Sequence, residues 1–139
     1  MGNQNHIKLE LCAPERPLVE LDVKELVAPG LHGLFTVQPG HTPFFSILRT
    51  GALVVDCAES GKRFFAVHDG FIEVLNDRVV ILAQTMEEEE EIDPDRAEAA
   101  KQRAQQILAQ RNRDIDHSRA EAALERALAR LHAHSRVEH

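Results

Sequence analysis

The first part of the chain alternates between apolar and polar positions in short segments that turn residues divide. Ile7, Leu9 and Leu11, for example, are separated by a lysine and a glutamate. Such a two-residue period is typical of a half-buried strand. Turn residues recur at intervals of roughly 8 to 12 residues, as they do in sandwiches and barrels. We expect strands over residues 7–11, 18–28, 34–37, 44–48, 52–57, 63–68, 71–75 and 78–83.

This pattern predicts an all-β domain of roughly eight to ten strands that ends near residue 83. Hairpin turns are expected at residues 59–62, at Asp69-Gly70 and at Asn76-Asp77, because glycine, aspartate and asparagine favour tight turns between antiparallel strands. Each predicted strand carries enough β-branched or aromatic residues to pack one face into a core.

The pattern changes after an unbroken run of glutamates at residues 87–91. Beyond Pro94 the chain has no glycine or proline, and the motif Ile-Asp-x-x-Arg-Ala-Glu-Ala-Ala occurs at residues 92–100 and again at 115–123. The aspartate of each copy can cap a helix, and proline suits the first helical position. We therefore predict a β-sandwich domain over residues 1–86 and a helical hairpin over 87–139, with helices at about 94–111 and 116–133.

The helical period places small residues along one face of each predicted helix. The stripe on the first helix holds Ala97, Ala100, Ala104, Ile107 and Arg111, and that on the second holds Ala120, Ala123, Leu124, Ala127 and Leu131. Alanine buries little apolar surface, so a hairpin joined by such stripes is expected to be marginally stable unless it packs on something else. Marginal packing suits an element that moves.

Arginines repeat with a similar spacing beside these stripes. Arg96 and Arg103 are seven residues apart, and Arg119, Arg126 and Arg130 are spaced by seven and then four. One interpretation is a solvated charged face with pairing along each helix. The other is that both sets converge on a polyanion, for which the guanidinium group is well suited.

Composition and charge narrow the function classes. The net charge of −7 disfavours a general nucleic-acid binder, and with no Trp or Tyr the core must consist of aliphatic residues and six Phe. Cys12 and Cys57 lack metal-ligand spacing and are expected to be two free thiols rather than a disulfide. No leader and no long apolar run are evident, so we expect an intracellular protein without a membrane span.

The β part offers few candidates for chemistry. His41 lies in the rigid loop Pro-Gly-His-Thr-Pro and could form a metal trio with His32 and His68, but these histidines lack the spacing that places two ligands on one strand face. We favour a structural role for His41. No nucleophile–base arrangement or glycine-rich phosphate loop is present, so we expect neither catalysis nor a bound metal.

Four motifs together resemble the epsilon subunit of F-type ATP synthases. They are the loop at residues 39–43, Asp-Gly-Phe-Ile-Glu-Val at 69–74, the apolar strand at 79–83 and Ile-Asp-x-x-Arg-Ala at 92–97. The similarity runs in order from Ile7 to about Leu131. It implies a flattened sandwich of about ten strands followed by two helices, in a peripheral complex on the cytoplasmic face of the bacterial inner membrane.

The resemblance also implies partners and a non-catalytic role without a required cofactor. The sandwich would bind the gamma subunit and the rotor ring subunits, and it would contact the membrane only through the complex. The hairpin would either fold on the sandwich or extend into the alpha/beta catalytic head and inhibit ATP hydrolysis. Some bacterial members of this family bind ATP on the folded hairpin as a regulatory ligand.

Site residues carry over by motif. The ATP site would comprise Glu87, Ile92, Asp93, Arg96, Ala97, Arg103, Arg126 and Arg130, with Arg119 as a further candidate. Contact with the catalytic head would use Arg119, Arg126 and Arg130. The rotor ring would meet Leu34 and His41, although Leu34 stands where the family usually has an acidic residue. The run of five glutamates at 87–91 places like charge beside any bound phosphate.

Two other functions remain open from the sequence. One is a free-standing β-barrel enzyme or metal protein that uses His41, with the helices as a dimerisation arm. The other is a cytosolic nucleotide sensor outside any ATPase. Metal analysis would separate the first from a rotor subunit, and co-purification of a gamma subunit would separate the second.

Overall fold

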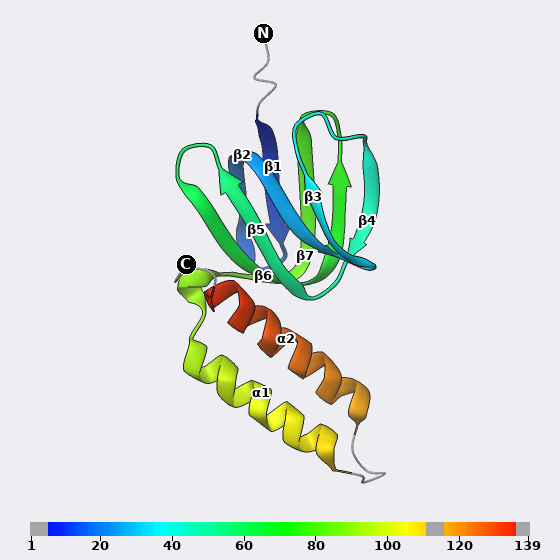
Figure 1. The fold of residues 1–139 in the computed structure, drawn as a ribbon, viewed down its shortest axis with the longest axis vertical. Coiled ribbons are helices and arrows are strands. Elements are labelled where there is room, and N and C mark those ends of the chain that lie inside the picture. Colours follow the sequence, from blue (N-terminus) through cyan, green and yellow to red (C-terminus); the bar gives the residue numbers. More distant parts are fainter. Residues whose placement is uncertain (1–5, 111–115, 136–139) are drawn as a thin grey trace.

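A computed structural model describes residues 6–110 and 116–135 and has a β-sandwich with a helical hairpin beneath it (Figure 1). The strands are β1 (Ile7–Ala13), β2 (Arg16–Gly30), β3 (Gly33–Val37), β4 (Phe44–Leu48), β5 (Gly51–Cys57), β6 (Gly61–Val74) and β7 (Arg78–Glu88). A 3-10 turn, η1 (Glu89–Glu91), leads to α1 (Pro94–Ala109) and α2 (His117–Ser135). The predicted fold class is confirmed.

The strands are fewer and longer than expected, because some of them pair with two neighbours in turn. β6 pairs with β5 over residues 61–67 and with β4 over residues 70–74, so it passes from one part of the sandwich to another. The predicted hairpin turn at Asp69-Gly70 is wrong. Asp69 adopts a φ of 52° and bends the strand, while pairing with β7 keeps one register from Phe65 to Val74. β7 also continues beyond residue 83 to Glu88.

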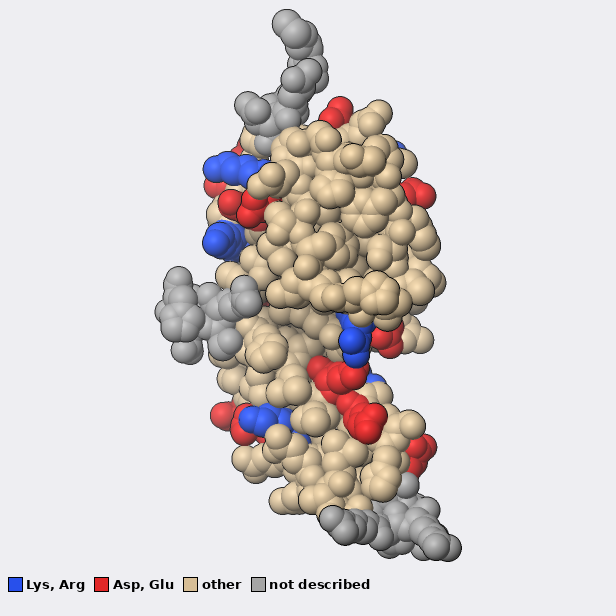
Figure 2. Space-filling view, turned by 45° about the vertical axis from the view of Figure 1, so that its right-hand side comes forward, with Lys and Arg blue, Asp and Glu red and all other residues tan. Residues whose placement is uncertain are grey.

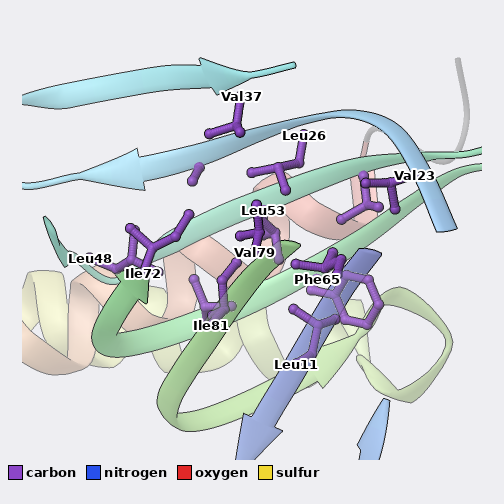
Figure 3. Close-up of a cluster of buried hydrophobic side chains, with 14 of the residues drawn as sticks. Leu11, Val23, Leu26, Val37, Leu48, Leu53, Phe65, Ile72, Val79 and Ile81 are labelled. Atoms are coloured by element: carbon purple, nitrogen blue, oxygen red, sulfur yellow. The ribbon is translucent and has the colours of Figure 1, made fainter. Parts of the chain in front are cut away.

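The core lies inside the sandwich and is formed by the alternating apolar residues that the sequence predicted to be buried. Ile7, Leu9 and Leu11 are at most 2% exposed, and Phe65 at the centre is fully buried. Figure 3 shows Leu11, Phe65 and other core side chains converging from separate strands, and the described residues of this main cluster come from the sandwich alone. The sandwich therefore has a core that does not depend on the hairpin, which is the physical basis for treating it as a domain.

Both helices begin as the repeated motif predicts. The Asp93 carboxylate accepts hydrogen bonds from the amides of Asp95 and Arg96 at 3.0 and 3.2 Å, and Pro94 follows it. The Asp116 carboxylate accepts one from the Arg119 amide at 3.0 Å. These caps satisfy amides that have no partner within the helix, so the local sequence determines where each helix starts.

The hairpin packs in two layers, with α2 between the sandwich and α1 (Figure 1). α2 contacts β5 and β6 through Ala129 and Ala133, which join a small cluster with Phe64, Ala66 and Ile92. Other alanines at seven-residue spacing are also buried on the helices, namely Ala97, Ala104, Ala120 and Ala127.

The apolar stripe of α1 is narrower than predicted. Ile107 was expected within it but is 39% exposed, because the buried positions repeat every seven residues and Ile107 lies at the edge of that seam. Arg111, which was also assigned to the stripe, lies outside the described residues, as does the predicted link at 112–114.

The structure also bears on the cysteines and on membrane-spanning helices. Cys12 and Cys57 are both free thiols, as predicted; Cys57 is buried and Cys12 is half-buried. Within residues 6–110 and 116–135, no helix has the length and apolarity to cross a membrane.

Candidate functional site

A cavity of about 390 Å³ lies where the end of β7, the η1 turn and the two helices meet. A volume of this size falls in the range of small-ligand sites, roughly 300–1,000 Å³. The lining residues are Glu87, Glu91, Asp93, Arg96, Ala97, Ala100, Arg103 and Arg130. The structure thus brings six of the eight residues assigned to the ATP site to one place.

The remaining two assigned residues lie elsewhere. Ile92 is 6% exposed and packs with Phe64 under α2, so its role here is to anchor the hairpin. Arg126 is half-buried on α2 and is not part of the cavity wall. Two residues of the cavity, Glu91 and Ala100, were not predicted from the sequence. Ala100 could have been found, because it lies three residues after Ala97 and so on the same face of α1; no sequence signal pointed to Glu91.

Three arginines from both helices supply the positive charge of the cavity. Arg96 and Arg103 lie about two turns apart on α1, are exposed, and form no ion pair with another described residue. Arg130 comes from α2, and its Nε donates a hydrogen bond to Glu87 Oε1 at 2.6 Å. The α1 arginines are therefore the cations that remain available to an anion.

Glu87 links the sandwich to the hairpin. Its Oε1 lies 3.3 Å from His68 Nε2 and also accepts the bond from Arg130. The hydrogen bond with His68 and then the one with Arg130 lower the pKa of Glu87 from 4.5 to about 2, although partial burial opposes the shift. The folded state is stabilised by this ionised carboxylate above pH 4.5, and the contribution is lost as the pH falls toward 2.

The other glutamates of the acidic run also have structural roles. Glu88 pairs with Arg63 of β6, and Glu91 pairs with Arg16 of β2 at 2.8 Å. Burial raises the pKa of Glu89, and the neighbouring carboxylates raise it further. From the sequence, the five negative charges of this run were expected to repel a bound phosphate. Ion pairing of Glu87, Glu88 and Glu91 reduces that opposition, because cations from the sandwich and from α2 offset these carboxylates.

The two residues assigned to the rotor ring lie within β3 and in the loop that follows it. Leu34 is 66% exposed near the start of β3, where it shares a second cavity with Leu128 of α2. His41 follows the other end of β3; its ring contacts Phe44, and its Nδ1 lies 2.9 Å from the Thr42 carbonyl oxygen. Within the part of the chain that the structure describes, no three His, Cys, Asp or Glu side chains are grouped to hold a metal.

An apolar face on the sandwich was not anticipated from the sequence. Cys12, Leu82, Phe71 and Ile47 are directly paired across β1, β7, β6 and β4, so they form one row. Phe45 stacks on Phe71 with ring centroids 5.5 Å apart. A hollow of about 800 Å³ is lined by this row, and Figure 2 shows a broad sandwich surface without charged side chains. The five residues define what we call the apolar face; a patch of this kind marks an interaction surface.

Two family models match the chain, one for each structural part. Residues 6–89 match the beta-sandwich domain of the ATP synthase delta/epsilon chain, and residues 90–135 match the long alpha-helix domain of the same chain. The division between the two models falls at the η1 turn, where the sandwich ends in the structure.

Relatives extend over most of the chain. It is 40% identical over 127 residues to the ATP synthase epsilon chain of Moorella thermoacetica, which covers 91% of this chain and 95% of the relative. It is 41% identical to the epsilon chain of Desulfosudis oleivorans over 103 residues, covering 74% and 77%. For that of Syntrophobacter fumaroxidans the identity is 45% over 104 residues, covering 75% and 77%.

Solved structures share the fold. A chain in the OSCP/F1/c-ring structure of the Euglena gracilis mitochondrial ATP synthase has a TM-score of 0.81 at 23% identity, covering 99% of this chain and 85% of that one. A chain in the central stalk and c-ring structure of the Tetrahymena thermophila enzyme has a TM-score of 0.56 at 16% identity, covering 96% of each. With both domain models matched in order and relatives at 40% identity or more, the chain belongs to the ATP synthase delta/epsilon chain family.

Proposed function

We propose that this chain is a non-catalytic rotor subunit in the central stalk of an ATP synthase, that its sandwich attaches it to the rotor, and that its hairpin regulates ATP hydrolysis. Family membership and the relatives named epsilon chain support the first part. Catalysis would belong to other chains of the complex, on the cytoplasmic face of a bacterial inner membrane.

Attachment to the gamma subunit is assigned to the apolar face. Phe45 is 63% exposed and Phe71 is 45% exposed, which is costly for large aromatic side chains unless a partner covers them. The sandwich keeps its own core, so this face can stay bound while the hairpin moves. The rotor ring subunits would meet the loops at the ends of β3.

The hairpin is proposed to sense ATP through the cavity at its base. The observation that supports this most directly is that arginines of both helices line one cavity and that Arg96 and Arg103 form no ion pair with another described residue. A phosphate chain bound there would bridge α1 and α2 and hold the hairpin folded. At 100 times Kd, a ligand that binds only the folded hairpin favours it by about 2.7 kcal/mol, which would shift a marginally packed hairpin toward the folded state.

We expect the isolated protein to bind ATP, and Arg103→Ala to weaken that binding about tenfold, because a charge-assisted hydrogen bond contributes roughly 1.5–3 kcal/mol. Isothermal titration calorimetry measures both. Arg78→Ala is the matched control, since Arg78 pairs with Glu10 at 2.6 Å on the sandwich, away from the hairpin. No heat with the unmodified protein at millimolar ATP, or equal affinity in Arg103→Ala, contradicts the sensing role.

Inhibition is proposed to require the extended hairpin. Arg119 is exposed and Arg126 is half-buried on α2, and extension would also release Arg130 from Glu87 to meet acidic groups of the catalytic head. We expect the triple alanine variant of these arginines to raise ATP hydrolysis by the assembled complex severalfold, measured at low ATP. An unchanged rate in a complex that demonstrably contains the variant would rule out this charge contact.

A further inference from the structure

We propose that His68 is a positioning residue for the hairpin: by donating a hydrogen bond to Glu87, it fixes the carboxylate that holds Arg130 of α2 against the sandwich. His68 is not among the residues that carry over from the family motifs, and it does not line the cavity. The effect of His68 on hairpin opening does not depend on the proposed function, whereas its effect on nucleotide affinity rests on that function.

His68 is unusual in its burial. It lies on β6, is 3% exposed, and is the only buried polar or charged residue among those that the structure describes. Its Nδ1 is buried without a hydrogen-bond partner in the described part of the chain, whereas its Nε2 lies 3.3 Å from Glu87 Oε1. A buried polar ring is costly to fold unless its hydrogen bonds are made, so the contact with Glu87 is the one that offsets the cost.

The chemistry of the contact defines the roles of the three groups. With the proton on Nε2, the imidazole donates to Glu87 Oε1, and the Arg130 Nε–H donates to the same oxygen at 2.6 Å. The carboxylate is thus held between a rigid ring in the sandwich and a cation on α2. Without His68, Glu87 would keep one of these two donors, and its side chain, 29% exposed, could rotate into solvent.

We call the contacts of His68 and Arg130 with Glu87 the latch of the folded hairpin. A second ion pair between α2 and the sandwich joins Arg49 and Glu125 at 3.7 Å, with both side chains about half exposed, and such pairs contribute little. The remaining contacts of α2 with the sandwich include Ala129 and Ala133, which bury small surfaces. A well-held carboxylate should therefore have a measurable effect on how often α2 leaves the sandwich.

The same contact prepares Arg130 for a ligand. Its Nε donates to Glu87, while its two Nη groups form no hydrogen bond with described residues, and its side chain lines the cavity. Holding this side chain in place before binding reduces the entropy cost of ordering it around a phosphate. His68 would thereby influence nucleotide affinity without touching the nucleotide.

Two substitutions of His68 in the full-length chain test the proposal. His68→Leu removes the donor with similar volume, and His68→Gln is the conservative variant, because its amide nitrogen can occupy the position of Nε2. We expect His68→Leu to increase hydrogen exchange of the α2 amides about threefold to tenfold without nucleotide, since the loss of a typical intramolecular hydrogen bond has an effect of that order. His68→Gln should restore slow exchange.

The stability of the sandwich separates positioning from a merely structural role. Because leucine removes a buried nitrogen without a described partner, His68→Leu is expected to leave the urea midpoint of the sandwich unchanged or higher while the hairpin loosens. Arg78→Gln, which removes another cross-strand ion pair, is the control and should leave α2 exchange unchanged. Faster exchange throughout the sandwich, unchanged exchange in α2, or no rescue by His68→Gln would each overturn the proposal.

Calorimetry with ATP keeps the two hypotheses distinct. If the unmodified protein binds ATP, His68→Leu is expected to lower the affinity about threefold to tenfold. If it binds no ATP, the sensing function fails, but faster α2 exchange in His68→Leu with rescue by His68→Gln still supports the latch. Full ATP affinity in a His68→Leu protein with a loosened hairpin would overturn the link to Arg130 in the cavity.

Discussion

Gly70→Ala is expected to destabilise the sandwich by about 3 kcal/mol or more, which would lower its melting temperature by roughly 12 °C or more. A Cβ at Gly70 would lie 2.1 Å from the carbonyl oxygen of Leu82 and 2.9 Å from the Cα of Ala83, both backbone atoms of β7. β7 cannot withdraw without breaking its pairing with β6 on both sides of the bend. Thermal unfolding followed by circular dichroism measures the effect.

Gly61→Ala provides the matched control for Gly70. Gly61 has a φ of +77° but open space around its missing Cβ, so the substitution should cost only about 1 kcal/mol of backbone strain. A melting temperature for Gly70→Ala close to that of Gly61→Ala would show that β6 and β7 are not tightly apposed at the bend.

The double substitution Phe45→Thr/Phe71→Thr is expected to weaken association with the gamma subunit about a hundredfold or more. Burying a large apolar side chain contributes roughly 1.5–3 kcal/mol, and these two rings stack on one another at 5.5 Å. Threonine preserves strand propensity, and both positions are exposed, so the fold should persist. Co-expression with the gamma subunit, followed by affinity measurement on the purified pair, gives the result.

Ile107→Thr is the control for the apolar face. Ile107 is 39% exposed on α1, so it tests whether loss of any exposed apolar side chain reduces association. We expect its complex with the gamma subunit to form normally. If the double variant also keeps full affinity, the gamma subunit binds another surface and the assignment of the apolar face is wrong.

The ATP-site residues and the rotor-ring residues were both assigned by motif. The family resemblance assigned eight residues to one ATP site, and six of them line one cavity. The resemblance also assigned Leu34 and His41 to the rotor ring; the structure places Leu34 within β3 and His41 in the loop after it, and their contact with a ring stays a prediction. Helical periodicity relates positions that lie within a few turns of one helix, whereas the contacts of a loop residue depend on which strands lie beside it.

The sequence by itself determined the features that depend on near neighbours. The alternation of Ile7, Leu9 and Leu11 identified a strand with one buried face, and Asp93 with Pro94 identified the start of a helix. Both follow from backbone geometry and hydrogen bonding within a few residues, so no distant partner is needed to predict them.

Only the tertiary structure decided the features that depend on register and strand order. The apolar face exists because β1, β7, β6 and β4 bring Cys12, Leu82, Phe71 and Ile47 into one row. His68 and Arg130 meet Glu87 although they lie 19 and 43 residues from it in the chain. Such contacts depend on which strands become neighbours, and a one-residue change of register would turn each of these strand side chains to the opposite face.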